Sequence, residues 1–333
     1  MKIDKRIKSY NKKNKEELEK AIKTIEPFLI QAFTNFYGKQ YQEQIKNTIK
    51  SIHFTYFLSL DFFKLVDIKS LCLSKKDQRS IIYYLHYLNK FYTQIKGIND
   101  LEGLEKAALK KVIVKSAFSD QRLINSNFLE YLSNDVPMYF IIADEEEEHF
   151  YKSIFLPLLV IDLETIIHEI NHALMIDIMA ITEEEFVMPS LFITEACEEL
   201  INDYIARLVL KEYIQMKAPI PSVLRKFDFV NAYEIYSYLI EPFFHHFEPI
   251  IKESIMTKNF NLLKMYAGKD DFALFCSLVQ EYYLQDGCTK EEYSALKTLV
   301  LKMADHAASM TNPNYEEYFH ELENKGFRIR KLK

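Results

Sequence analysis

Hydrophobic positions recur at two different periods along the chain, and the changes of period divide it into three regions. In the first region, apolar residues at helical spacing predict helices over 16–36, 41–63 and 77–95. From about residue 105 the chain shows short apolar runs rich in β-branched and aromatic residues, which predict strands at 112–114, 138–142 and 154–160. Pro137 and Pro157 favour a sheet edge or a bulge for the last two strands, because proline donates no hydrogen bond to a neighbouring strand.

The last third returns to helical spacing, with predicted helices over 232–255, 271–284, 290–310 and 315–325. Only 6 of the 333 residues are glycine, which also favours helices over turn-rich β structure. We therefore expect an α+β protein that is predominantly α-helical. Its N-terminal helical subdomain would span 1–104, its core 105–210 and its C-terminal helical subdomain 211–333.

One helix in the core carries a recognisable chemistry. Asp162 is a suitable N-cap, and an apolar face follows it at helical spacing, formed by Leu163, Ile166, Ile167, Ile170, Leu174 and Ile178. The opposite face carries His168 and His172, which belong to a His-Glu-x-x-His motif. Histidines four residues apart lie one above the other on a helix and can bind one Zn²⁺, while Glu169 can reach a metal-bound water.

A second helix, predicted over 194–208, carries an acidic stripe. Its apolar side includes Cys197, Leu200 and Tyr204, whereas the opposite side groups Glu195 and Glu199 with Asn202 and Ala206. A carboxylate shortly after His-Glu-x-x-His is where a third zinc ligand is expected.

The two helices together resemble the gluzincin metallopeptidases, the thermolysin-like clan, over about residues 162–208. In that family the second helix bears an Asn-Glu-Ala-x-x-Asp type of motif, which Thr194, Glu195, Ala196 and Glu199 match in part. The resemblance implies a zincin-like core, in which a small sheet with a substrate-binding edge strand precedes the metal helix. It also implies Glu195 as third ligand and Glu199 as the acid that orients a ligand histidine. The mismatches leave a second register open, with Glu199 as ligand and Asp203 as its support.

The resemblance further implies a downstream His or Tyr that stabilises the oxyanion of the tetrahedral intermediate. Tyr236, His245 and His246 are the main candidates, with Tyr233 and Tyr238 beside them. The expected activity is therefore peptide-bond hydrolysis with one Zn²⁺ per chain and Glu169 as general base.

Two other interpretations fit parts of the sequence. Three Glu-x-x-His pairs are typical of di-iron carboxylate proteins, namely Glu146 with His149, Glu169 with His172 and Glu317 with His320. Alternatively, a zincin-like core could have become a non-catalytic binding or regulatory domain, although such a domain would have no need of Glu169.

Composition narrows the partners rather than the reaction. A net charge of −6 gives no reason to expect nucleic-acid binding, and no apolar run is long enough to span a membrane. Four widely spaced cysteines and a lysine-rich N-terminus without an apolar signal segment favour a cytoplasmic protein. We expect a peptide or protein substrate. The sequence does not indicate the oligomeric state.

Overall fold

Helices form most of the part of the chain that the computed structural model describes, which comprises residues 5–57, 138–144, 149–157, 161–175, 194–225, 234–259 and 261–310. The N-terminal helices are α1 (Lys5–Tyr37), the 3₁₀ turn η1 (Lys39–Tyr41) and α2 (Gln42–Ser51). The central helices are α8 (Leu163–Met175) and α9 (Glu195–Gln215). The C-terminal group comprises η5 (Glu234–Tyr236), α10 (Ser237–Thr257), α11 (Asn261–Ala267), α12 (Lys269–Leu284) and α13 (Lys290–Ser309).

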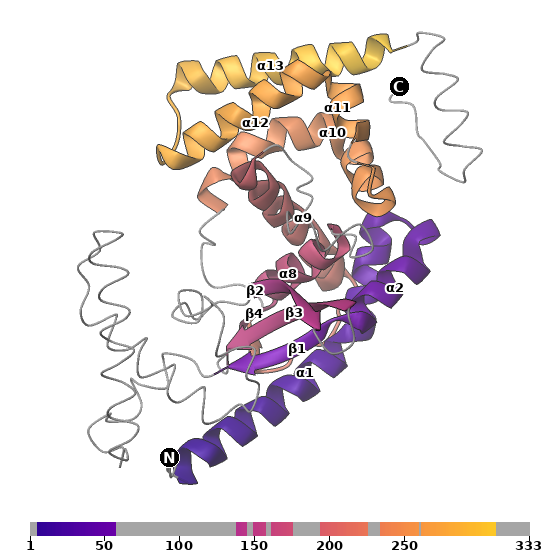
Figure 1. The fold of residues 1–333 in the computed structure, drawn as a ribbon, viewed down its shortest axis with the longest axis vertical. Helices are drawn as coiled ribbons and strands as arrows, with labels where there is room; N and C mark the ends of the chain where they lie inside the picture. Colours follow the sequence, from indigo (N-terminus) through magenta and orange to yellow (C-terminus); the bar gives the residue numbers. More distant parts are fainter. Residues whose placement is uncertain are drawn as a thin grey trace.

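Within the described residues, a three-stranded sheet lies against one side of α8 (Figure 1). Its strands are β1 (His53–Phe57), β2 (Met138–Asp144) and β3 (His149–Pro157), in the order β1-β3-β2. β3 pairs with β1 in parallel and with β2 antiparallel. A second pair, β4 (Ile161–Asp162) with β5 (Leu224–Arg225), is parallel and leads directly into α8.

The helix predicted over 41–63 is wrong at 53–57, because the chain enters β1 at His53, and its last residues lie outside the described ones. The segment His-Phe-Thr-Tyr-Phe is aromatic and β-branched, so it suits a strand once β3 offers a partner. Ser153 of β3 also donates its hydroxyl to the His53 carbonyl at 3.0 Å. The N-terminal region therefore contributes a strand to the sheet of the predicted core.

Other predicted elements are confirmed with small shifts. The helix over 16–36 lies within α1, those over 271–284 and 290–310 are α12 and α13, and the helix over 232–255 corresponds to η5 and α10. The strand over 138–142 lies in β2, which is an edge strand of the described sheet. β3, however, is central, and Pro157 is its last residue, where a missing N–H ends the strand.

Three predicted elements, at 77–95, 112–114 and 315–325, lie outside the described residues, and so does the domain boundary at 104. The boundary at 210 falls within α9. The division into three subdomains therefore stays a prediction.

α9 is the centre of the packing. It contacts α1, α8, α10 and α12, and Figure 1 shows it between the N-terminal helices and the C-terminal group. Residues on several sides of it are fully buried, among them Leu200, Ile205, Ala206 and Val209. The position of α9 is therefore fixed by packing against several helices.

Candidate metal centre

α8, the helix predicted to bind a metal, begins as its sequence predicts. The Asp162 carboxylate accepts a hydrogen bond from the Glu164 backbone N–H at 2.9 Å, which satisfies one of the unpaired amides of the first turn. The apolar face of α8 is fully buried, including Ile166, Ile167 and Ile170. At its other end, the Lys152 and Lys258 ammonium groups donate to the carbonyls of Ala173 and Leu174. These cations offset the partial negative charge of the helix C-terminus.

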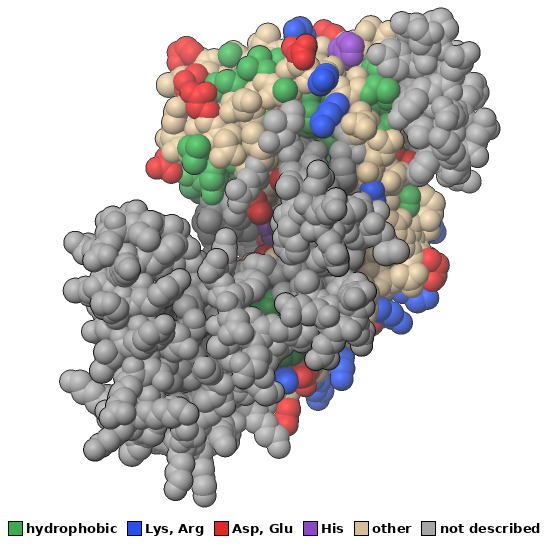
Figure 2. Space-filling model, in the orientation of Figure 1, with side chains coloured by type: hydrophobic (Ala, Val, Ile, Leu, Met, Phe, Trp, Pro, Cys, Tyr) green, Lys and Arg blue, Asp and Glu red, His purple; other side chains and the backbone are tan. Residues whose placement is uncertain are grey.

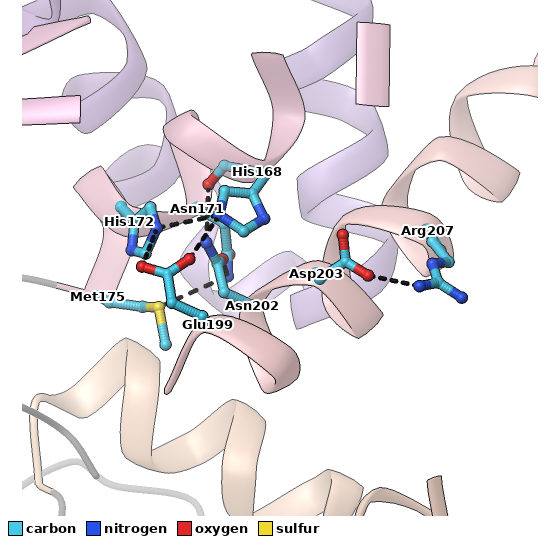
Figure 3. A network of polar contacts seen from close by, with 8 residues as sticks. All are labelled: His168, Asn171, His172, Met175, Glu199, Asn202, Asp203 and Arg207. Atoms are coloured by element: carbon cyan, nitrogen blue, oxygen red, sulfur yellow. Dashed lines mark hydrogen bonds and ion pairs between the residues drawn. The ribbon is translucent and has the colours of Figure 1, made fainter. Parts of the chain in front are cut away.

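Three side chains converge between α8 and α9 (Figure 3). The Nε2 atoms of His168 and His172 lie 3.1 Å apart. The Glu199 carboxylate places Oε2 3.1 Å from Nε2 of His168 and Oε1 3.4 Å from Nε2 of His172. Among the described residues, these three form the group of His, Cys, Asp or Glu side chains able to hold a metal ion.

The separations suit a tetrahedral zinc site. Two ligand atoms that each lie about 2.0–2.1 Å from a tetrahedral ion are about 3.3 Å apart. The observed distances of 3.1, 3.1 and 3.4 Å are close to that spacing. Two imidazole nitrogens and one carboxylate also match the donor set of catalytic zinc sites with three protein ligands.

Glu199, the ligand of the second register, is the carboxylate that α9 brings to the histidines. Glu195 is the first residue of α9, one turn before Glu199, and its side chain lies outside the described residues. Its role as third ligand stays a prediction. Asp203, the expected support of Glu199, instead contacts the Arg207 guanidinium at 2.5 Å, and Figure 3 shows its carboxylate pointing toward that arginine. Its supporting role likewise stays a prediction.

Charge complementarity holds the cluster together. Burial alone would raise the pKa of Glu199, but hydrogen bonds from His168 and His172 and their charges outweigh burial and lower the pKa well below its usual range. For His172, burial acts to lower the pKa, yet the hydrogen bond and charge of Glu199 raise it to about 9. The Glu199 carboxylate is thus ionised, and its negative charge stabilises a positive charge beside it, either on the His172 imidazole or on a bound cation.

Glu169 lies next to the cluster and is 8% exposed. Burial raises the pKa of its carboxyl group, against the lowering effect of His168 and His172 and of a hydrogen bond from the Tyr139 backbone. A carboxylate with a raised pKa is better suited to take up and return a proton near neutral pH.

Tyr139 of β2 links the sheet to the cluster. Its ring is nearly parallel to that of His172, with an interplanar angle of 17° and centroids 6.1 Å apart. Its hydroxyl is buried and has no hydrogen-bond partner among the described residues. Tyr139 is not among the site residues predicted from the sequence, because a tyrosine in a strand is usually a packing residue.

The predicted oxyanion donors make other contacts. Tyr236 donates its hydroxyl to Asp286 at 2.9 Å, and Tyr238 lies 3.7 Å from the Cys288 thiol. His245 and His246 pack edge to face on α10, and His245 is exposed. Tyr233 lies outside the described residues. The donor role of these residues stays a prediction.

Figure 2 shows histidine and acidic atoms on this face of the molecule, near the position of α8 and α9 in Figure 1. Of the three Glu-x-x-His pairs, only that of Glu169 and His172 lies wholly within the described residues. In the described cluster, His172 is joined by His168, which a di-iron pair would not require.

Comparisons of the chain with protein-family models, curated proteins and solved structures find no match. The resemblance to gluzincins therefore rests on the two motifs alone. None of the described helices is both long and apolar enough to cross a membrane.

Proposed function

We propose that this chain is a zinc-dependent metallopeptidase in which His168, His172 and Glu199 hold one Zn²⁺ and Glu169 is the general base. The observation that carries the proposal is the convergence of two imidazole nitrogens and one carboxylate at 3.1–3.4 Å. One bound cation would account for this convergence, because both Nε2 atoms and the carboxylate could then each direct a lone pair at the same ion.

The metal would supply an activated water, with a pKa near about 7, and a Lewis acid for a carbonyl oxygen. The protein groups divide the remaining work. His168 and His172 come from one helix and Glu199 from its neighbour, so the site forms only when α8 and α9 are packed. Glu169 would take the proton of the attacking water and pass it to the departing amine.

The backbone of Tyr139 fixes the Glu169 carboxylate by a hydrogen bond. β2, which provides this bond, lies at the edge of the described sheet, where an extended peptide could pair with it. This placement supports a peptide or protein as substrate.

Zinc content tests the ligand set. We expect one zinc per purified chain by elemental analysis, and loss of zinc in Glu199→Ala. Glu195→Ala is the matched control, because it removes a carboxylate one turn away on the same helix. Zinc retained by Glu199→Ala and lost by Glu195→Ala would assign the ligand to Glu195 instead. Two irons per chain would favour the di-iron interpretation.

Hydrolysis tests the reaction. Glu169→Gln keeps the size of the side chain but cannot accept the proton, so we expect the variant to retain its zinc and to lose at least about 100-fold in kcat. The measurement is cleavage of a mixed peptide library followed by mass spectrometry, with the wild-type chain before and after chelation as the reference. Undiminished cleavage by Glu169→Gln would remove Glu169 from this role.

A further inference from the structure

A chain of buried hydrogen bonds runs from the N-terminal helix to the backbone of a proposed zinc ligand. Tyr37 of α1 donates its hydroxyl to Oδ1 of Asn171 at 2.5 Å. Nδ2 of Asn171 donates to Oδ1 of Asn202 on α9 at 2.6 Å, and Nδ2 of Asn202 donates to the His168 carbonyl at 3.1 Å. Figure 3 shows Asn171 and Asn202 beside His168 and Glu199.

The direction of these bonds is set from one end. The His168 carbonyl can only accept, so Asn202 presents its amide nitrogen to that carbonyl and its oxygen to Asn171. Asn171 therefore donates through its amide nitrogen, and its oxygen is left to accept from the Tyr37 hydroxyl. The second hydrogen of that amide points to the sulfur of Met175 at 3.7 Å. Asn202 thus accepts a hydrogen bond from Asn171 and donates one to the His168 carbonyl. Each amide therefore has a single orientation that satisfies its neighbours.

The packing alone gives no reason for these amides. Asn171 and Asn202 are both 0% exposed, and Tyr37 is 4% exposed. Buried amides cost free energy that a good hydrogen bond only partly returns, whereas leucines of the same shape would be neutral or better. A role other than stability is the better explanation for their presence.

The carbonyl that ends the chain belongs to the peptide group between His168 and Glu169. A bond to this group from α9 fixes the rotation and the sliding of α8 against α9. The same two helices must hold Glu199 opposite His168 and His172. A displacement of about 1 Å between them would remove the separations that a zinc ion needs.

We propose that Tyr37, Asn171 and Asn202 form a positioning relay that sets the distance between the two halves of the zinc site. The inference rests on the proposed zinc site, but it does not depend on the peptidase reaction. It makes α1, which supplies no ligand in the described cluster, a determinant of metal affinity.

The first test compares two tyrosines. Tyr37→Phe removes only the hydroxyl that begins the relay. Tyr213→Phe is the matched control, because Tyr213 is 0% exposed and its hydroxyl makes one bond of 2.6 Å, to the Pro219 carbonyl. We expect both variants to lose similar stability in the metal-free state. Only Tyr37→Phe should weaken zinc binding, by about tenfold, when the full chain competes with a chromogenic chelator for Zn²⁺.

The second test replaces the whole relay. Tyr37→Phe/Asn171→Leu/Asn202→Leu leaves none of the three polar side chains to seek a partner, so the variant should fold with stability close to that of the wild type. Its zinc dissociation constant should nevertheless rise by more than about tenfold. Bound Co²⁺ should also show a visible absorption spectrum different from that of the wild-type complex. If this variant fails to fold, the comparison of Tyr37→Phe with Tyr213→Phe decides alone.

Wild-type zinc affinity in Tyr37→Phe would overturn the relay and leave the zinc site intact. An equal loss of affinity in Tyr213→Phe would also overturn it, because the effect would then be one of general stability. A wild-type chain that takes up no zinc would overturn the relay together with the proposed function. A zinc-binding chain without peptidase activity would contradict only the proposed reaction.

Discussion

Two helix contacts in this molecule are equally buried but differ in chemistry. At the contact of α8 with α9, the fully or nearly buried side chains include Glu164, His168, Asn171, Asn202 and Asp203. Where α10 meets α12, they include the phenylalanines Phe243, Phe272 and Phe275. Phe243 packs against Phe247, Phe272 and Phe275 with ring centroids 4.7, 5.7 and 4.6 Å apart.

The difference separates two tasks. Aromatic rings stabilise the fold through burial and are tolerant of small shifts, because dispersion and the hydrophobic effect have little directional preference. Polar side chains cost free energy when buried but demand particular distances and angles. The C-terminal helices thus provide stability, and the α8–α9 contact provides a defined geometry. Substitutions on either side should therefore affect different measured quantities.

The largest expected effect is on the apolar side. Phe243→Ala removes a ring that is 0% exposed, so we expect the free energy of unfolding to fall by about 3–5 kcal/mol. Urea denaturation of the metal-free chain measures this loss. Leu274→Ala is the control on α12, because Leu274 is 50% exposed and its removal should cost less than about 0.5 kcal/mol. The zinc dissociation constant of folded Phe243→Ala should stay within about twofold of the wild-type value, because the substitution does not touch the α8–α9 contact. A tenfold change would correspond to about 1.4 kcal/mol of binding free energy. A change of more than about twofold would mean that the two contacts are not separable.

A change of pH should have a smaller effect on the free energy of unfolding, through the polar α8–α9 contact. Glu199 raises the pKa of His172 from 6.5 to about 9, so the protonated pair stabilises the metal-free fold fully below about pH 6.5. This contribution, of order 3 kcal/mol, is lost as the pH rises toward 9. The low pKa of Glu199 keeps its carboxylate charged over this whole range. Urea denaturation of the chelated chain at about pH 6 and pH 9 measures the loss.

Glu199→Gln should abolish most of that pH dependence, because a neutral amide does not stabilise the imidazolium. With zinc present the sign reverses, since the metal needs neutral imidazole and competes with the proton. Metal-free stability that stays level or rises between pH 6 and pH 9 would contradict the pairing of His172 with Glu199.

The sequence predicts α8 well because its signals are local. Asp162 caps the helix, the apolar residues share one face, and the histidines are one turn apart. β1 could not be predicted in the same way. Its residues at 53–57 form a strand only because β3 lies beside them, and the paired residues His53 and Ser153 are 100 positions apart in the sequence. A strand stabilised by a distant partner leaves little periodic signal in five residues.

The sequence also does not distinguish Glu195 from Glu199 as third ligand. The two lie one turn apart on the same side of α9, so the helical pattern treats them alike. Their distance from the histidines depends on how α9 is placed along α8. Contacts from α12 help to fix that placement, since Gln280 accepts the Ala196 N–H and the Cys276 carbonyl accepts the Thr194 hydroxyl. These contacts join residues more than 80 positions apart.

Part of the predicted polar side of α9 is buried in the structure. The helical pattern grouped Asn202 and Ala206 with the acidic residues, yet both are 0% exposed. α9 has neighbours on several sides, so Asn202 and Ala206 face other parts of the protein rather than solvent. Amphipathic periodicity could identify the helix but not that its polar side is part of the core.

The smallest expected effect concerns the ring that connects the sheet with α8. Tyr139→Leu removes the aromatic surface parallel to His172, and we expect zinc affinity to fall by a few fold, about 1 kcal/mol. Tyr139→Phe is the matched control and should bind zinc within twofold of the wild type, because the Tyr139 hydroxyl has no hydrogen-bond partner among the described residues. Both constants come from chelator competition. A tenfold loss in Tyr139→Phe would show that the hydroxyl, rather than the ring, acts on the site, and would move Tyr139 from packing to direct participation in metal binding.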